Sequence, residues 1–166
     1  MTTLAPPPIG LLDKFFGDEA EPLYIGRIVV TGGEAAHGRA SGVVRSIDGA
    51  LRADLRLPAE LGGPGGGTNP EQLFAAAYAA CFHGVLHLLA QRAGIELGET
   101  RVEASVTFAR DPVDGLFQLS AELHAHIPGV DRGMAAELVR HAERYCPYAK
   151  MFRQGIDHVV ALAPDV

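Results

Sequence analysis

Runs of alternating or β-branched residues occupy the first third of the chain. They predict strands over Tyr24–Thr31, Val43–Ile47 and Leu51–Leu57. Asp48-Gly49, between the second and third runs, is a strong hairpin-turn signal. We therefore expect a three-stranded antiparallel meander in this part of the chain.

A glycine-rich segment, PAELGGPGGGTNP, leads into a helix that we expect to run from Pro70 to about Ala93. Thr68 or Asn69 can cap its first turn, Pro70 suits the first helical position, and Gly94 ends the helix. Apolar residues recur at helical spacing, and the stripe they form is Phe74, Ala77, Tyr78, Cys81, Val85 and Leu88. We expect this stripe, with Cys81 in it, to face the interior.

The last part of the chain alternates between strand and helix patterns. Arg101–Arg110 and Phe117–Ile127 read as strands paired about the turn DPVDG, and a helix is expected over Arg132–Tyr145. A final strand is expected over Ile156–Ala163. The predicted order is βββ-α-ββ-α-β, which favours the α+β class because the strands come in blocks.

Length and composition fit one compact domain. The chain has 166 residues, 48% of them hydrophobic, and we place an N-terminal arm at residues 1–22 and the domain at 23–166. The net charge of −6 supplies no basic surface for nucleic acid or an anionic membrane. With no signal peptide or membrane span expected, the predicted location is the cytoplasm.

Cys81 and Cys146 are the only cysteines, too few for a secreted disulfide framework. By position alone, Cys81 is most simply a packed, unreactive thiol. Cys146 lies in RYCPYAK, where Pro147 cannot continue the preceding helix and fixes the thiol at a helix end. A thiol within a helix and one at a helix end can approach each other across a packed helix pair, which leaves a redox role open.

Two motifs carry a family resemblance. The run GGTNPEQLFAAAYAACF and the later CPY are similar to the organic hydroperoxide resistance (Ohr) proteins of the OsmC superfamily, over roughly residues 24–163. The resemblance implies an intertwined homodimer with two sites at the subunit interface, two helices packed with antiparallel sheets, and no cofactor. It also implies a cytoplasmic thiol peroxidase that reduces organic hydroperoxides and is itself reduced by a lipoyl-type dithiol.

Site residues follow from the same resemblance. Cys81 corresponds to the peroxidatic cysteine, Cys146 to the resolving cysteine, and Glu71 to the glutamate of NPEQ. The family also has an arginine in a glycine-rich loop after the first strand. Here the loop reads TGGEAAHGRASG, and a short insertion places Arg39 in that role, with Arg45 and Arg27 as alternatives.

Other functions remain open at this stage. An osmotically inducible peroxidase of the same superfamily shares the two-cysteine chemistry, and a non-catalytic domain could use the apolar stripe to bind a fatty acid or lipid. A metal site on Cys81, His83 and His87 is disfavoured because residues 81 and 83 lie on different faces of a helix. His124 and His126 read as residues on one strand face, and we assign no role to His37 or His141.

Overall fold

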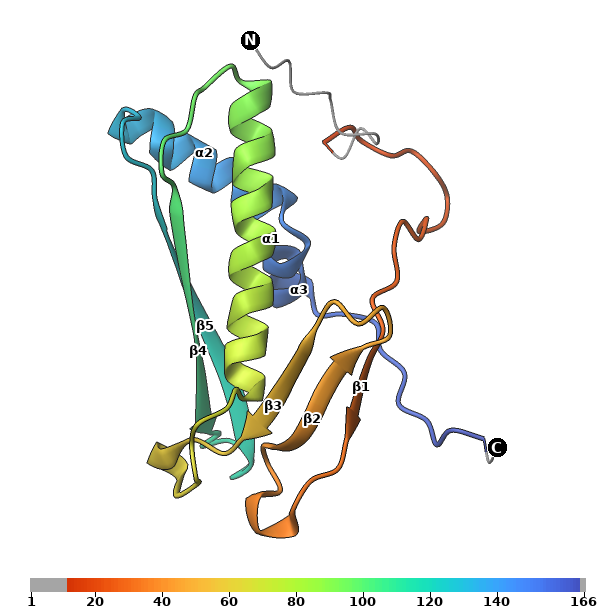
Figure 1. Ribbon diagram of the computed structural model, residues 1–166. Helices are drawn as coiled ribbons and strands as arrows, with labels where there is room; N and C mark the ends of the chain where they lie inside the picture. Colours follow the sequence, from red (N-terminus) through yellow and green to blue (C-terminus); the bar gives the residue numbers. More distant parts are fainter. Residues whose placement is uncertain (1–11, 165–166) are drawn as a thin grey trace. The chain divides into compact units, whose positions relative to one another are not determined.

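A computed structural model describes residues 12–164 (Figure 1). The chain forms two compact units. Among the described residues, one unit, here called the sheet unit, contains residues 12–77 and 104–122; the other, the cysteine unit, contains residues 78–103 and 123–164. Residues 12–27 form no helix or strand, and the rest of the predicted arm, residues 1–11, lies outside the described residues.

The predicted meander is confirmed in the sheet unit. Strands β1 (Ile28–Thr31), β2 (Ser41–Ser46) and β3 (Arg52–Arg56) form an antiparallel sheet in the order β1-β2-β3. The β2–β3 hairpin turns at Gly49, whose φ of 78° is costly for residues other than glycine. A short 3-10 turn, η1 (Ala35–His37), interrupts the connection between β1 and β2, and a second, η2 (Ala59–Leu61), follows β3.

Helix α1 (Pro70–Arg92) begins and ends where the sequence predicts. The Asn69 side chain accepts a hydrogen bond of 2.9 Å from the backbone N–H of Gln72, which identifies it as the cap. Gly94 then adopts a φ of 69°, and the N–H of Ile95 donates to the carbonyl of Ala90 at 2.9 Å. These bonds satisfy backbone groups that a helix end leaves without partners.

The most buried face of α1 is displaced by about one residue from the predicted stripe, although Tyr78, Cys81 and Val85 of that stripe do pack against the core. The fully buried positions are Phe82, Leu86 and Ala90, whereas Cys81 is only half-buried at the edge of that line. Apolar residues are spread around the whole of α1, so their spacing could not determine the buried face.

By length and composition alone, α1 could span a membrane, with a mean hydropathy of 1.7 over 18 residues. The core helix of a soluble protein passes the same test. However, only 22% of that window is buried, so α1 presents uncovered apolar surface.

The other elements are β4 (Arg101–Arg110), its partner strand β5 (Phe117–His126), α2 (Arg132–Tyr145) and α3 (Pro147–Gln154). The α+β class and the first seven predicted elements are therefore confirmed, and α3 is an additional helix. The predicted strand over Ile156–Ala163 was wrong, because that segment has no regular structure.

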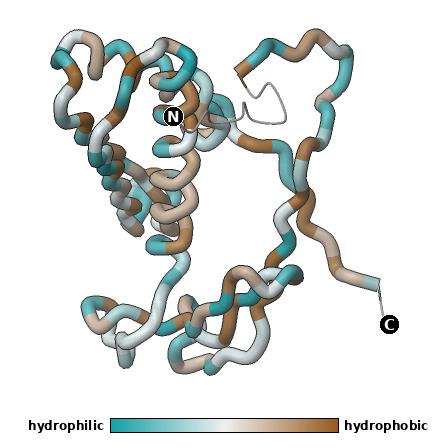
Figure 2. Tube along the Cα trace, turned by 45° about the horizontal axis from the view of Figure 1, so that its top comes forward, coloured by the Kyte–Doolittle hydropathy of each residue, from teal (hydrophilic) through white to brown (hydrophobic). Residues whose placement is uncertain are grey.

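The segment after α3 leads to the C-terminus, and Figure 2 shows hydrophobic stretches along it. Val159, Val160 and Leu162 are more than 90% exposed. A strand needs a neighbour to satisfy its backbone groups, and among the described residues this segment pairs with no strand. The β-branched and apolar residues of this segment are therefore not sufficient to form a strand here.

Candidate active site

The cysteine unit brings its two thiols together. Cys81 lies in the middle of α1 and Cys146 lies between α2 and α3, and their sulfur atoms are 3.7 Å apart. Both thiols are free. The sequence left open whether they approach each other, and the structure places them in contact.

Backbone chemistry fixes Cys146 at this position. It is the last cap of α2 and the first cap of α3, with φ −68° and ψ 118°. Such extended geometry is typical of a residue before proline, and Pro147 at the first position of α3 enforces it. The Cys146 N–H donates to Ala142 at 2.8 Å and its carbonyl accepts from Lys150 at 3.0 Å, so both helices anchor the cysteine.

Apolar side chains surround the thiol pair. Cys146 is fully buried in the core cluster of the cysteine unit, which comprises Phe82, Leu86, Ala90, Leu138, Ala142, Cys146 and Ala149. Cys81 and Tyr78 pack against this cluster, and the Tyr78 ring meets the Phe152 ring edge-on, with centroids 4.9 Å apart. Burial, then the neighbouring Cys146, raise the pKa of the Tyr78 hydroxyl. The thiols therefore lie in a largely apolar environment.

This environment opposes ionisation of Cys81. Burial, followed by the adjacent Cys146 thiol, raises its pKa to about 11, while a hydrogen bond from the backbone N–H of Tyr148 acts in the opposite direction. None of these influences is a cation. The cysteine unit by itself therefore disfavours the Cys81 thiolate, and an additional positive charge near the sulfur would favour it.

Arg39 and Glu71 form an ion pair in the sheet unit. Glu71 belongs to the first turn of α1, and Arg39 follows the η1 turn. The Arg39 guanidinium also stacks on Phe108 of β4, with Cζ 3.4 Å from the ring centroid. The sequence did not single out Phe108, because aromatic residues in a strand are ordinary sheet formers.

The alternative arginines have different surroundings. Arg27 and Arg45 are exposed, as is Arg39, so the three differ in their partners and not in whether they are exposed. Arg45 lies in β2, where its register partners are Val29 and Arg52. Of these three candidate arginines, Arg39 is the one for which the described structure has a carboxylate partner and an aromatic partner.

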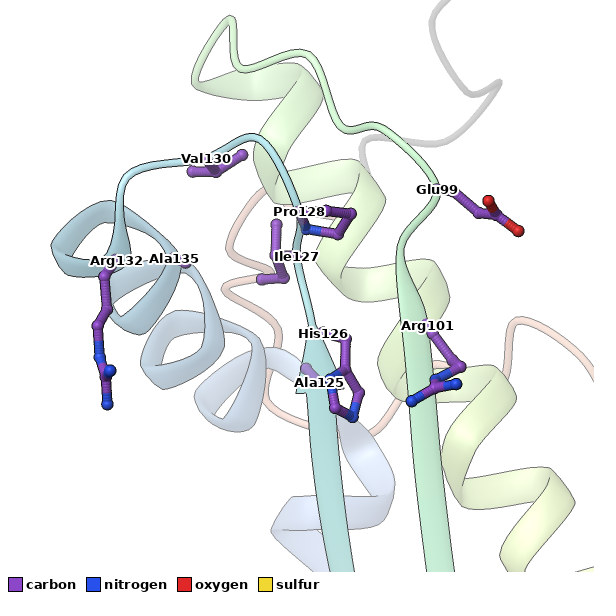
Figure 3. A pocket seen from close by; sticks show the side chains of 9 residues that line it. All are labelled: Glu99, Arg101, Ala125, His126, Ile127, Pro128, Val130, Arg132 and Ala135. Atoms are coloured by element: carbon purple, nitrogen blue, oxygen red, sulfur yellow. The ribbon is translucent and has the colours of Figure 1, made fainter.

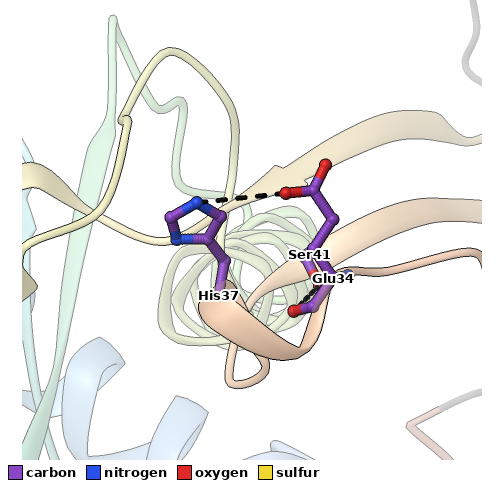
Figure 4. A network of polar contacts seen from close by, with 3 residues as sticks. All are labelled: Glu34, His37 and Ser41. Carbon is purple, nitrogen blue, oxygen red and sulfur yellow. Dashed lines mark hydrogen bonds and ion pairs between the residues drawn. The ribbon is translucent and has the colours of Figure 1, made fainter.

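The loop that carries Arg39 has its own polar contacts (Figure 4). The backbone N–H of Glu34 donates to the Ser41 hydroxyl at 2.9 Å, which closes the base of the loop. His37 Nε2 lies 4.0 Å from the Glu34 carboxylate, and Ala40, beside Arg39, is 2% exposed. The loop between β1 and β2 is thus fixed on both sides of Arg39.

His83, His87 and His126 make contacts away from the two thiols. The His83 and His87 rings share one face of α1, 4.4 Å apart, and burial followed by His83 lowers the pKa of His87. Within the described residues, no group of three or more histidine, cysteine or acidic side chains could hold a metal ion. His126 instead lies 3.8 Å from Glu103 across the β4–β5 ribbon.

A cavity of about 690 Å³ lies elsewhere in the cysteine unit (Figure 3). Arg101 and His126, on neighbouring strands, line this cavity together with Arg132 at the start of α2. Neither cysteine lines this cavity, so it is separate from the thiol pair.

Comparisons with known proteins show which family the chain belongs to. Residues 63–161 match the family model for OsmC-like proteins. The chain is 43% identical to an organic hydroperoxide resistance protein of Xanthomonas axonopodis pv. citri (strain 306), over 85% of this chain and 95% of that protein.

Solved structures give the same result. An organic hydroperoxide resistance protein of Legionella pneumophila is 41% identical with a TM-score of 0.71, covering 82% of this chain and 95% of its own. One of Elizabethkingia anophelis is 39% identical with a TM-score of 0.73, covering 83% and 94%. The chain therefore belongs to the organic hydroperoxide resistance proteins of the OsmC superfamily.

Proposed function

We propose that this protein is a thiol peroxidase that reduces organic hydroperoxides to alcohols. The observation that carries the proposal is the pair of free sulfurs 3.7 Å apart in an apolar environment. The names of its relatives support the same class of activity.

In the proposed reaction, the Cys81 thiolate attacks the terminal oxygen of ROOH. The O–O bond breaks, the alkoxide leaves and takes up a proton to give ROH, and Cys81 becomes a sulfenic acid. The Cys146 thiol then condenses with it, releasing water and forming a disulfide. Only a small movement is required, because the sulfurs must close from 3.7 Å to about 2.05 Å.

Arg39 is the cation that we propose for the first step. The environment of Cys81 raises its thiol pKa, so a guanidinium beside the sulfur would favour the thiolate and stabilise the departing alkoxide. Glu71 would orient that guanidinium through their ion pair. The two pairs belong to different units of the chain, and we propose that they meet at the subunit interfaces of a homodimer.

Uncovered apolar surface supports the dimer. The most apolar 18-residue window of α1 is only 22% buried, and the segment after α3 exposes several large aliphatic residues. Obligate homodimer interfaces resemble a domain core and would cover such surface. We predict about twice the 17.5 kDa chain mass in sedimentation at micromolar concentration; a monomer with full activity would contradict this arrangement.

The cycle closes when a dithiol reduces the Cys81–Cys146 disulfide. We propose a lipoyl-type dithiol, as the resemblance implies, and a cytoplasmic location, where reducing conditions keep thiols free. The apolar environment of Cys81 favours an organic peroxide over hydrogen peroxide.

Peroxide consumption tests the proposal directly. Cumene hydroperoxide and hydrogen peroxide are supplied separately, with reduced lipoamide as the dithiol. Faster consumption of cumene hydroperoxide is expected, with the disulfide detected by mass spectrometry when the dithiol is omitted. A preference for hydrogen peroxide would contradict the proposed class of substrate. Absence of turnover with intact, unoxidised thiols would favour the apolar-ligand binding domain.

A further inference from the structure

Arg39 is held from two directions within the sheet unit. Its guanidinium donates to the Glu71 carboxylate, and its Cζ lies 3.4 Å from the centre of the Phe108 ring. All N–H donors of a guanidinium lie in its plane, so a carboxylate takes an edge while an aromatic ring can cover a face. The two contacts therefore restrict different motions of the same group.

Phe108 is itself supported. Its ring packs on Phe117 of β5, with centroids 4.8 Å apart and planes 30° apart, and the Arg110 guanidinium lies 5.3 Å from the Phe117 centroid. This geometry suits aromatic and cation–π attraction. These pair contacts link Arg39 to Phe108, Phe108 to Phe117 and Phe117 to Arg110, and we call this series the aromatic ladder.

The glycine-rich backbone of the loop that carries Arg39 explains why its side chain needs these contacts. Arg39 follows Gly38 and the η1 turn, in a connection that also contains Gly32 and Gly33 at positive φ. Glycine-rich backbone loses more conformational freedom on ordering than other sequence does, so it does not hold a long side chain in place by itself. Glu71 fixes one edge of the guanidinium, and a second restraint is needed to fix its plane.

We infer that Phe108 is a positioning residue for Arg39, holding the plane of the guanidinium that acts on Cys81. The inference rests on the proposed function. Phe108 provides the direct contact, and Phe117 keeps the Phe108 ring in place. Phe108 itself performs no chemistry, so its loss should lower the rate of Cys81 oxidation only while Arg39 is present.

The test is the second-order rate of Cys81 oxidation by cumene hydroperoxide. Phe108→Leu keeps apolar bulk but removes the aromatic face, and should slow the reaction roughly 5-fold, within the range of roughly 2- to 30-fold that a cation–π contact represents. Phe108→Tyr keeps the face and should stay within about 2-fold of wild type. Phe117→Leu should cost less than Phe108→Leu. Phe16→Leu, at a position 90% exposed, controls for the substitution itself.

A double-mutant comparison separates positioning from structure. In the Arg39→Ala background, Phe108→Leu should produce no further loss, because the group it positions is gone. The NMR signals of the Arg39 guanidinium protons give a second readout. Ring current should shift them upfield in wild type and Phe108→Tyr but not in Phe108→Leu.

Several results would overturn the inference. An equal loss from Phe108→Leu with and without Arg39 would make its role structural. If wild type reacts with hydroperoxide and Phe108→Leu reacts equally fast, the inference about Phe108 is wrong but the proposed function stands. A wild-type protein that does not react with hydroperoxide would remove the proposed function, and the inference with it.

Discussion

Cys146 is fully buried among the apolar residues of the cysteine unit, whereas Arg39 stands on a loop of the sheet unit with 31% of its side chain exposed. Close packing holds the thiols, and a substitution there changes a densely filled core. Arg39 is held instead by the carboxylate of Glu71 and the ring of Phe108. Either contact can be removed without leaving a large cavity. The two regions can therefore be perturbed separately.

Their electrostatics differ as strongly as their packing. Burial raises the pKa of the Cys81 thiol, while Arg39 carries a permanent charge that Glu71 balances. An apolar environment suits the organic part of a hydroperoxide but does not stabilise an anion. In the proposed enzyme the sulfur is therefore reactive only where the arginine reaches it, which makes thiol reactivity a measure of that encounter.

The largest expected effect is on turnover, and it should differ between substitutions of the two cysteines. Cys81→Ser should abolish turnover because the attacking sulfur is lost. Cys146→Ser should still react once with organic hydroperoxide and then stall as a sulfenic or over-oxidised acid, because no second thiol is available. Mass spectrometry after one equivalent of peroxide distinguishes the products. Oxidation of Cys146 in the Cys81→Ser protein would reverse the assignment.

The next largest effect is expected from removing Arg39, in the loop between β1 and β2. Arg39→Ala should slow Cys81 oxidation by at least roughly 100-fold, the scale on which loss of one oriented electrostatic partner is felt. Arg45→Ala and Arg27→Ala are matched controls and should cost far less. The measurement is the second-order rate with an organic hydroperoxide. A collapse in either control beside a normal Arg39→Ala rate would move the role to that arginine.

The sequence predicted best what depends on neighbouring residues. The Gly49 turn, a helix cap at Thr68 or Asn69 and the helix end at Gly94 need only a few adjacent positions. The meeting of Cys81 and Cys146, 65 positions apart, depends on how α1, α2 and α3 pack, and no local pattern determines that. The terminal strand over 156–163 was wrong for a related reason. Apolar and β-branched residues favour extended backbone but supply no partner strand.

The candidate site residues also differ in how far the sequence could identify them. Cys81, Cys146 and Glu71 stand in motifs that can be recognised without a structure. The choice of Arg39 depended on placing a loop insertion, and its contact with Phe108 joins a loop to a strand that is far away in the sequence. The first of these could be proposed from sequence, whereas the second required coordinates.

Glu71→Gln offers an intermediate test of how the loop arginine is held. It removes the charged partner of Arg39 but leaves the guanidinium and the Phe108 ring in place. The oxidation rate of Cys81 should therefore fall between those of wild type and Arg39→Ala. Glu34→Gln, in the same loop, is the matched control and should have little effect. If Glu71→Gln equalled Arg39→Ala, Glu71 would do more than orient the arginine.

The smallest effect is on the pH dependence of the thiol when the arginine is missing. In Arg39→Ala, burial and Cys146 should hold the pKa of Cys81 near about 11, above its ordinary value of 9.0. The rate of alkylation should rise with pH toward that value, whereas wild type should reach its plateau at lower pH. Cys146→Ser in both backgrounds restricts the alkylation signal to Cys81.

A raised pKa also gives stability a defined slope. Between pH 9.0 and about 11 the folded thiol keeps a proton that the unfolded chain has lost, so folding stability falls as pH rises through this window. Chemical unfolding of Arg39→Ala, compared with Arg39→Ala combined with Cys81→Ser, isolates this contribution. The difference should be constant below pH 9.0 and should decrease above it. A difference that instead grew with pH would mean that the thiolate is stabilised without Arg39, and that another cation serves Cys81.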